Sequence, residues 1–337
     1  MRALVFEEYG GPLTVREVPD PVPPDGGVVV QVRATGVCRS DWHGWQGHDP
    51  DISLPHVPGH ELAGTVAAVG TGVTRWKVGD RVTVPFVNAC GRCPRCLQGD
   101  HQVCDDQRQP GFTHWGSFAE LVALDHADVN LVALPEGMSF SAAAGLGCRF
   151  ATAYRAVLAQ GRAAAGEWVA VHGCGGVGLS AIQVAVSAGA SVVAIDVSPG
   201  ALELAKQMGA THALRPPAVP EVKRLTDGGA HLSIDAFGSE ETCLASIASL
   251  RSRGRHVQVG LLPGPKFPVP MARVLFRELE LIGSHGMSAQ GYGEMLARIA
   301  AGELDPGRLV TRELGLDDAA EALAEVGVQP GVAVITF

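Results

Sequence analysis

The sequence contains four cysteines whose spacing suits a metal site. Cys90, Cys93, Cys96 and Cys104 form the pattern C-x2-C-x2-C-x7-C. Four thiolates from one loop fit a closed, tetrahedral zinc site. An iron–sulfur motif also begins C-x2-C-x2-C, but its next gap is about three residues, and disulfide pairs are disfavoured where cysteines stay reduced. The spacing therefore favours structural zinc.

A second chemical signal is a glycine loop, HGCGGVG, at residues 172–178. It fits G-x-G-x-x-G at Gly173, Gly175 and Gly178, with Gly176 between them, and it follows an apolar run and opens a helical pattern. In such loops the glycines allow a tight turn, close approach of a pyrophosphate and helix packing on the strand. The helix N-terminus adds N–H donors for the phosphates. The alternative is a glycine-rich turn without a ligand, and the context favours a dinucleotide site.

Asp196 ends the next apolar run, 23 residues beyond Gly173. A carboxylate at that point accepts hydrogen bonds from the adenosine ribose and repels a 2′-phosphate. No Lys or Arg follows within four residues, so the sequence favours NAD over NADP. The alternative is a local role, in which Asp196 or Ser198 caps the helix expected from Pro199.

The elements that would carry the glycine loop alternate between strand and helix from about residue 150. Apolar runs predict strands at 168–173, 191–196, 232–237, 256–260 and 279–285, with helices at 177–189, 199–209 and 240–250. Alternation of this kind predicts a parallel sheet with helices on both faces. The basic string at 251–256 is expected to form a solvated turn before a strand.

The cysteine loop lies in a segment with a different sequence pattern, without the strand–helix alternation. Residues 1 to about 145 have short runs rich in Val, bounded by Gly, Pro and Asp, at 28–37, 62–70, 80–86 and 118–124. These predict an antiparallel β domain with long loops. After Gly286 we expect helices at 292–304 and 317–326 and a closing strand at 331–337, and we expect this tail to return to the first domain.

Length and composition agree with a folded chain of about two domains, because 337 residues are 46% hydrophobic and 18% charged. A net charge of −9 argues against nucleic acid or an anionic membrane as partner. The uncharged stretch between Glu167 and Asp196 is interpreted as a buried strand–helix–strand unit rather than a membrane span. The N-terminal residues show no export signal, so we expect a cytoplasmic protein.

Several motifs occur in one order along essentially the whole chain. They are CRSDWH at 38–43, GHE at 59–61, the four-cysteine loop, GCRFAT at 147–152 and the glycine loop. In this order the sequence resembles the zinc-dependent medium-chain alcohol dehydrogenases. The resemblance implies an α/β protein with a GroES-like β catalytic domain, residues 1–148 and 286–337, and a Rossmann domain with a doubly wound parallel sheet, residues 149–285. It also implies an active site in the cleft between them.

By this resemblance Cys38, His60 and Cys148 hold a catalytic zinc. Two thiolates and a neutral imidazole cancel the metal charge and leave a fourth position open. Asp41 is the expected partner that orients His60. Glu61 is either a transient ligand or a structural carboxylate. Without the resemblance the two cysteines are more simply small buried residues.

The resemblance also assigns a proton relay to Ser40 and His43. The alcohol loses its proton to the hydroxyl, and the proton passes through the cofactor ribose to His43. Zinc makes this feasible at neutral pH, because it lowers the pKa of bound water from 15.7 to about 7. The alternative for His43 is a surface histidine without function.

Further positions follow the same pattern. Arg39 corresponds to a contact with the cofactor pyrophosphate, and Thr152 and Val177 to contacts with the nicotinamide ring. Trp45 and Phe86 correspond to the substrate pocket, with core packing as the alternative. Trp42 and Trp115 are weaker pocket candidates, and the remaining cysteines, Cys174 and Cys243, are expected to be packing residues.

The sequence therefore predicts an enzyme that oxidises primary or secondary alcohols reversibly with NAD, holds two zinc ions per chain, and forms a homodimer or homotetramer. One alternative is a zinc-dependent polyol dehydrogenase or an aldehyde or ketone reductase of the same superfamily. The other is an NAD(H)-binding structural or quinone-binding relative. Such relatives typically lack the zinc ligands that this chain retains.

Overall fold

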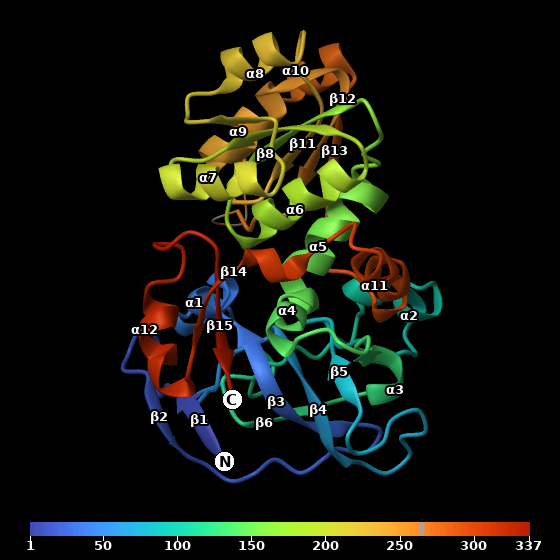
Figure 1. Ribbon diagram of the computed structural model, residues 1–337, viewed down its shortest axis with the longest axis vertical. Coiled ribbons are helices and arrows are strands. Elements are labelled where there is room, and N and C mark those ends of the chain that lie inside the picture. Colours follow the sequence, from blue (N-terminus) through green and yellow to red (C-terminus); the bar gives the residue numbers. More distant parts are fainter. Residues whose placement is uncertain (263, 265) are drawn as a thin grey trace. The chain divides into compact units, whose positions relative to one another are not determined.

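The chain forms two compact units in a computed structural model that describes residues 1–262, 264 and 266–337. The first unit comprises Met1–Ala151 and Gly286–Phe337, and the second comprises Thr152–His285 (Figure 1). In the described part of the chain, no helix is both long enough and apolar enough to span a bilayer.

The first unit is built on a mostly antiparallel seven-stranded sheet. Its order is β14-β15-β3-β4-β5-β7, with β6 pairing with β3, and only β14 and β15 run parallel. The strands are β3 (Val28–Gly36), β4 (Leu62–Val69), β5 (Arg81–Thr83), β6 (Leu121–Leu124), β7 (Val132–Ala133), β14 (Val310–Leu314) and β15 (Val332–Thr336). A separate hairpin joins β1 (Arg2–Val5) and β2 (Thr14–Glu17). The antiparallel β domain expected from the short Val-rich runs is therefore present.

The C-terminal tail completes this sheet. β15 pairs with β3 through Val334 opposite Gly36 and Ile335 opposite Thr35. Because β3 leads directly to Cys38, the last strand supports the backbone just before that residue; Val37 also donates its N–H to the Ala333 carbonyl at 2.9 Å.

The helices of the first unit are short. They are α1 (Arg39–Trp45), α2 (Pro94–Leu97), α3 (Ala127–Asn130), α4 (Phe140–Ala144), α11 (Tyr292–Ala300) and α12 (Ala319–Ala324). A side chain caps the start of α1, α2 and α4. In α1 the capping box is formed by Cys38 and Asp41, and Asp41 thereby satisfies a backbone N–H that a helix start leaves free.

The second unit contains a six-stranded parallel sheet in the order β10-β9-β8-β11-β12-β13. The strands are β8 (Trp168–His172), β9 (Ser191–Ile195), β10 (His212–Leu214), β11 (Ala230–Asp235), β12 (Leu250–Gln258) and β13 (Glu280–Gly283). Numbered within the unit, this order is 3-2-1-4-5-6, the arrangement of a dinucleotide-binding Rossmann sheet. The predicted α/β fold class is confirmed.

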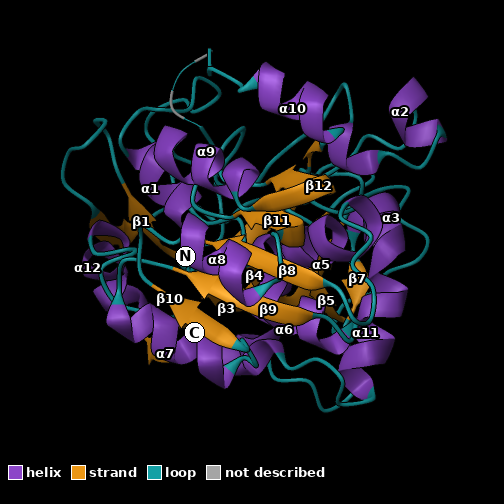
Figure 2. Ribbon diagram, turned by 90° about the horizontal axis from the view of Figure 1, so that it is seen from above, coloured by secondary structure: helices purple, strands orange, loops and turns teal. Residues whose placement is uncertain are grey.

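Helices cover both faces of the parallel sheet, with α6 on one side and α9 on the other (Figure 2). The helices of this unit are α6 (Gly176–Ser187), α7 (Pro199–Gln207), α8 (Val219–Leu225), α9 (Glu240–Ala248) and α10 (Met271–Arg277), and α5 (Ala151–Tyr154) lies at the unit boundary. In α6 every residue from Gly178 to Ala185 is buried. This burial explains the uncharged stretch, which forms a strand–helix–strand unit as predicted.

The basic string at 251–256 was expected to be a turn, and that expectation is wrong. These residues lie inside β12. Ala230 pairs with Leu250 but Leu232 pairs with Arg255, so β12 bulges between them, and Arg253 adopts a positive φ of 61° at the bulge. The bulge exposes Ser252 and Arg253 to solvent, so charged and polar residues are tolerated within the strand. The sequence here therefore lacks the apolar pattern from which a buried strand is predicted.

We predict that acid destabilises the second unit through His172. This histidine is 2% exposed, and burial, with a smaller effect of His256, lowers its pKa to about 3. The stability contributed by the neutral ring is complete above pH 6.5 and is lost as pH falls from there towards 3. At pH 5, 1.5 units below the unfolded-state pKa, the loss is about 2 kcal/mol. Urea unfolding of wild type and His172→Gln at pH 7.5 and 5 should show a smaller pH dependence in the variant, and equal dependence would contradict the prediction.

Candidate active site

A single carboxylate, that of Asp41, organises the centre of the first unit. Its Oδ2 accepts the Cys38 N–H at 3.1 Å. Its Oδ1 accepts the Gly59 N–H at 3.0 Å and the His60 Nδ1–H at 2.8 Å. Asp41 is 1% exposed, so these bonds are shielded from water. The carboxylate thus ties the start of α1 to a loop 18 residues further along the chain.

Four predicted residues come together beside Asp41. Ligand atoms of Cys38, His60, Glu61 and Cys148 all lie within 4.8 Å of one another. His60 donates from Nδ1 to Asp41, and its buried Nε2 has no hydrogen-bond partner among the described residues. A buried nitrogen without a partner is costly, whereas a metal ion would satisfy it. Two thiolates and one imidazole fit a zinc ion with an open fourth position.

The protonation behaviour of these groups also fits a cation. A hydrogen bond from the Cys148 thiol, together with His60, lowers the pKa of Cys38 well below its usual value. The same bond raises the pKa of Cys148, and burial adds to that rise. Burial lowers the pKa of His60, but Asp41 and Cys38 outweigh it and raise the pKa well above its usual value. Without a metal the buried site therefore retains protons that a zinc ion would displace.

Cys148 lies in a π-helical turn, Leu146–Phe150, that also positions Arg149. The Arg149 N–H donates to Glu61 Oε1 at 2.8 Å, and its guanidinium forms an ion pair with Glu61 Oε2 and donates to the Val37 carbonyl at 3.0 Å. Both side chains are buried. Glu61 is thus near the metal ligands but is held by Arg149, a partner that the sequence analysis did not identify, although Arg149 lies in the quoted motif GCRFAT.

The space for this ion pair depends on Gly36. A Cβ at Gly36 would lie 2.5 Å from Glu61 Oε2 and 3.0 Å from the Arg149 guanidinium. Any side chain at this point of β3 would therefore displace the pair. A buried charge that loses its partner is strongly destabilising, so glycine is required here by close approach.

Helix α1 presents the predicted relay residues. The Ser40 hydroxyl lies 3.9 Å from the Cys38 sulfur, and His43 follows three positions later on the same helix face. The His43 Nδ1 lies 2.9 Å from the Nδ1 of His48. Arg39, the predicted pyrophosphate contact, is exposed, stacks on the Trp42 ring at 4.4 Å and donates to the Val326 carbonyl at 3.0 Å.

Two phenylalanine rings lie beside His60. The Phe86 ring centroid is 6.1 Å from that of His60, and Phe112, which the sequence analysis missed, is 5.2 Å away. Trp45 packs with Phe112 in an apolar cluster and donates its indole N–H to the Gly11 carbonyl at 2.9 Å. Trp115 donates to the Pro55 carbonyl at 2.9 Å. Phe86 and Phe112 therefore form an apolar wall beside His60.

The four-cysteine loop has the dimensions of a single-ion site. The sulfurs of Cys90 and Cys96 are 4.0 Å apart and those of Cys93 and Cys104 are 3.8 Å apart. Zinc–sulfur bonds of about 2.3 Å in a tetrahedron place sulfurs about 3.8 Å apart. All four cysteines are free, and these separations are too long for a disulfide bond of about 2.05 Å.

Backbone groups in this loop stabilise thiolates unevenly. The Cys96 N–H, with further donors, lowers the pKa of Cys93 to about 6, whereas burial raises the pKa of Cys96 to about 12. Four thiolates in so small a volume repel one another unless a cation is present, so the loop could hold one metal ion.

The glycine loop of the second unit has the geometry that a bound pyrophosphate requires. Gly173 adopts a φ of +90° at the turn, and a Cβ at Gly178 would lie 1.8 Å from the Gly173 carbonyl oxygen. A Cβ at Gly175 would meet no described atom within 4 Å, so this face of the loop is open. The loop leads directly into α6, whose first N–H groups have no partner within the helix.

Asp196 connects the glycine loop to the next strand. Its Oδ2 accepts the Cys174 N–H at 2.7 Å and its Oδ1 accepts the Ser198 N–H at 2.8 Å. Ser198, not Asp196, provides the side-chain cap of α7. Each carboxylate oxygen has a second lone pair, so Asp196 retains capacity to bind a ribose hydroxyl.

The other predicted cofactor residues and the two spare cysteines occupy the second unit. Val177 is partly exposed in the first turn of α6. Thr152 is buried, and its hydroxyl makes no hydrogen bond within the part of the chain that the structure describes. Cys174 and Cys243 are buried.

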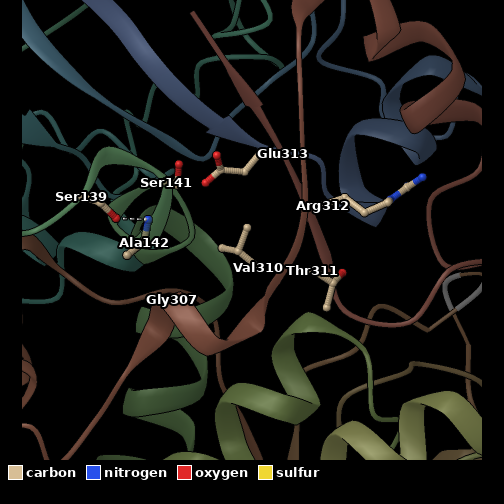
Figure 3. A pocket seen from close by; sticks show the side chains of 8 residues that line it. All are labelled: Ser139, Ser141, Ala142, Gly307, Val310, Thr311, Arg312 and Glu313. Atoms are coloured by element: carbon tan, nitrogen blue, oxygen red, sulfur yellow. Dashed lines mark hydrogen bonds between the residues drawn. The ribbon is translucent and has the colours of Figure 1, made fainter.

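A separate pocket of about 280 Å³ lies in the first unit between the start of α4 and β14 (Figure 3). Residues 139–142 and 307–313 provide its lining. None of the predicted site residues lines it, and nothing in its mixed polar lining indicates a ligand.

Comparison with known proteins identifies similar chains over nearly the whole length. Residues 24–136 match the alcohol dehydrogenase GroES-like domain family, and residues 176–301 match the zinc-binding dehydrogenase family. The chain is 37% identical over 310 residues to an alcohol dehydrogenase of Geobacillus stearothermophilus, covering 90% of each protein. It is 33% identical to an NAD-dependent alcohol dehydrogenase of Sulfurisphaera tokodaii, covering 96% of this chain and 95% of that protein. The solved structure of alcohol dehydrogenase TADH from Thermus sp. ATN1 superposes with a TM-score of 0.92 at 33% identity, covering 100% of this chain and 99% of that chain.

We predict that Asp41→Ala weakens zinc binding at Cys38, His60 and Cys148 by about 10- to 100-fold, because the His60 ring loses the partner that orients it. Competition with a chromophoric chelator measures the affinity. Asp41→Asn, which keeps an acceptor but loses the charge, should show a smaller loss. Asp128→Ala is the matched control, since Asp128 also accepts two backbone N–H groups, from Thr74 and Arg75, at a place remote in sequence from the ligands. Wild-type affinity in Asp41→Ala would contradict the assignment.

Proposed function

The chain belongs to the zinc-type medium-chain alcohol dehydrogenases, and on this basis we propose that Cys38, His60 and Cys148 hold the catalytic zinc at which it oxidises alcohols with NAD. The enzyme converts alcohols to aldehydes or ketones reversibly. The observation that supports the site is the convergence of two thiols and an otherwise unpartnered imidazole nitrogen beside a serine hydroxyl.

Zinc in this ligand set supplies a Lewis acid that lowers the pKa of a bound hydroxyl group. The protein residues supply the rest. Asp41 keeps the His60 ring oriented, and Ser40, 3.9 Å from the Cys38 sulfur, receives the proton that the alcohol loses. His43 holds that proton, since its pKa range suits proton transfer near neutral pH. Phe86 and Phe112 exclude water beside the ligand histidine.

We assign Glu61 a structural role first and a transient ligand role second. Arg149 engages both oxygens of the Glu61 carboxylate. Movement of Glu61 towards the metal would leave the buried Arg149 charge without its partner, which is costly. The pair therefore favours a zinc with three protein ligands and an open position.

We assign the cofactor to the second unit, with the pyrophosphate at Gly173, Gly175, Gly176 and Gly178, the ribose at Asp196, and the nicotinamide near Thr152 and Val177. Arg39 is the proposed further contact with the pyrophosphate. The open face at Gly175 and the free lone pairs of Asp196 support this assignment.

The second zinc is proposed at Cys90, Cys93, Cys96 and Cys104, for a total of two per chain. Sulfur separations of 3.8 and 4.0 Å support it. Because thiolate ligands require reduced cysteines, and all eight cysteines are free, we also propose a cytoplasmic location.

We propose a homo-oligomer, a dimer or a tetramer. β13 is an edge strand of the parallel sheet, and next to it α10 exposes Leu275 at 72% and Phe276 at 83%. An open edge beside apolar side chains is unfavourable in water and suits pairing with another copy. Light scattering of the purified protein gives the subunit number directly.

The polar-substrate alternative, a polyol dehydrogenase or an aldehyde or ketone reductase, is less well supported. The rings next to His60 are the hydrocarbon rings of Phe86 and Phe112, which offer no hydrogen bonds to additional hydroxyl groups. An apolar wall of this kind favours alcohols with a hydrocarbon chain or ring. The structural or quinone-binding alternative is not supported, because the similar proteins are alcohol dehydrogenases, one of them described as NAD-dependent.

We predict that Cys148→Ala reduces turnover to background and lowers the zinc content from two ions per chain to one, while NADH binding is unchanged. Removal of one thiolate leaves two protein ligands, too few to retain the ion. Metal analysis and NADH fluorescence titration measure both effects. Cys243→Ala is the matched control, because Cys243 is a buried cysteine outside both clusters, and it should retain two zinc ions. Retained turnover in Cys148→Ala would refute the ligand assignment.

We predict that Asp196→Asn narrows the preference for NAD over NADP by about tenfold, the equivalent of one charge-assisted hydrogen bond of about 1.4 kcal/mol. The ratio of kcat/KM for the two cofactors is the measurement. Ser198→Ala removes the α7 cap and serves as the control, with lower stability but the same ratio. If Asp196→Asn, like Ser198→Ala, lowered stability without changing the ratio of kcat/KM for the two cofactors, Asp196 would have only a local structural role.

A further inference from the structure

His43 is hydrogen-bonded to a second histidine that the relay assignment does not include. The Nδ1 atoms of His43 and His48 are 2.9 Å apart, and the ring centroids are 5.2 Å apart. At this distance one Nδ1 donates a proton and the other accepts it. The two rings therefore share one proton across the Nδ1–Nδ1 contact.

The local backbone holds the two rings in place. The His48 N–H donates to the His43 carbonyl at 3.0 Å, just beyond the end of α1. The Trp42 ring contacts both imidazoles edge-on, at centroid distances of 5.1 Å to His43 and 5.9 Å to His48. Arg39 stacks on the Trp42 ring. The pair is thus a built arrangement and not a chance approach of two mobile side chains.

We propose that His48 is the outer acceptor of the proton relay, so that the proton leaves the active site through two histidines in series. This inference rests on the proposed role of His43 and extends it by one residue. His48 does not touch the reacting atoms; it acts by exchanging a proton with His43.

The proton balance is simple. In alcohol oxidation the released proton reaches His43 at Nε2, the ring nitrogen not used by His48. His43 then gives its Nδ1 proton to the Nδ1 of His48, and His48 releases its Nε2 proton to water. One proton enters and one leaves, and both rings end neutral with exchanged tautomers. This pair of tautomers can begin the reverse, reductive reaction. Because both rings reach water, proton exchange with solvent restores the pair of tautomers that either direction requires.

The surroundings favour outward transfer. His43 is partly buried, whereas His48 is exposed. A positive charge is less favourable on a desolvated ring than on a hydrated one. Burial, with Arg39 and His48, lowers the pKa of His43, and Cys38 opposes that shift only in part. A proton on His43 therefore moves readily to the exposed neighbour.

The test uses the zinc-loaded full chain and the pre-steady-state burst of NADH formation, which separates chemistry from product release. The probe is the fastest of ethanol, 1-butanol and benzyl alcohol. We expect His48→Ala and His48→Asn to slow the burst at pH 7 by roughly tenfold. This is less than the usual 10²–10⁴ for general acid–base catalysis, because water also reaches His43. Adding 2-methylimidazole, whose methyl group hinders metal binding, should restore the rate in both variants and leave wild type unchanged.

The asparagine variant separates proton transfer from positioning. Its side chain offers a hydrogen-bonding atom near the place of Nδ1 but cannot carry a proton onward. If His48 only orients His43, His48→Asn will have the wild-type rate, and the inference is overturned. Gln46→Ala, in the same segment, is the control and should have the wild-type burst rate.

The double variant His43→Gln/His48→Asn distinguishes failure of this inference from failure of the relay itself. If both histidines lie on one path, the double variant is as slow as His43→Gln alone. Additive losses without rescue by 2-methylimidazole would overturn the role of His48 and leave that of His43 intact. A wild-type burst rate in His43→Gln would instead remove the relay assignment and, with it, this extension.

Discussion

The Asp41 carboxylate is the interaction on which the active site depends. It accepts hydrogen bonds from the Cys38 N–H, the Gly59 N–H and the His60 ring. These bonds start helix α1, fix the loop before His60 and set the tautomer that leaves Nε2 free for a metal. The start of the helix that carries Ser40 and His43 is thus anchored by the same carboxylate as His60, the proposed metal ligand. A single buried carboxylate therefore positions residues of both the proposed metal site and the proposed proton path.

Near the Asp41 carboxylate, the other buried charges of the first unit are also balanced by a partner. The buried Arg149 and Glu61 neutralise each other behind the metal ligands, in a space that Gly36 leaves open. Two thiolates and a neutral imidazole would balance the zinc charge. The centre can therefore be buried without an unpaired ion, which a low-dielectric interior would not tolerate.

The second unit is proposed to bind a long anionic cofactor, and it offers backbone N–H groups rather than charged side chains for the phosphates. Its strand order 3-2-1-4-5-6 places the turn after β8 where the winding of the sheet reverses. The glycines then open that turn, and Asp196 joins it to β9. If the proposed pyrophosphate site is correct, N–H groups and a helix N-terminus would bind the phosphates without a cluster of basic residues at the loop.

Elements whose signals are local could be predicted from the order of the amino acids. Periodicity predicted most of the Rossmann strands and the helices α6, α7 and α9. It missed the short β10, the bulged start of β12, where charged residues masked the strand, and the helices α8 and α10. Spacing identified the four-cysteine loop and the glycine loop, because in each the ligand groups lie within a few residues of one another. The order of several motifs identified the family. Three contacts became visible only in the folded chain: Arg149 pairs with Glu61, Phe112 lies beside His60, and His48 is hydrogen-bonded to His43. The first two contacts join segments dozens of residues apart, and the third depends on how the chain turns after α1. Each is set by packing and hydrogen-bond geometry, which leave no periodic trace in the sequence.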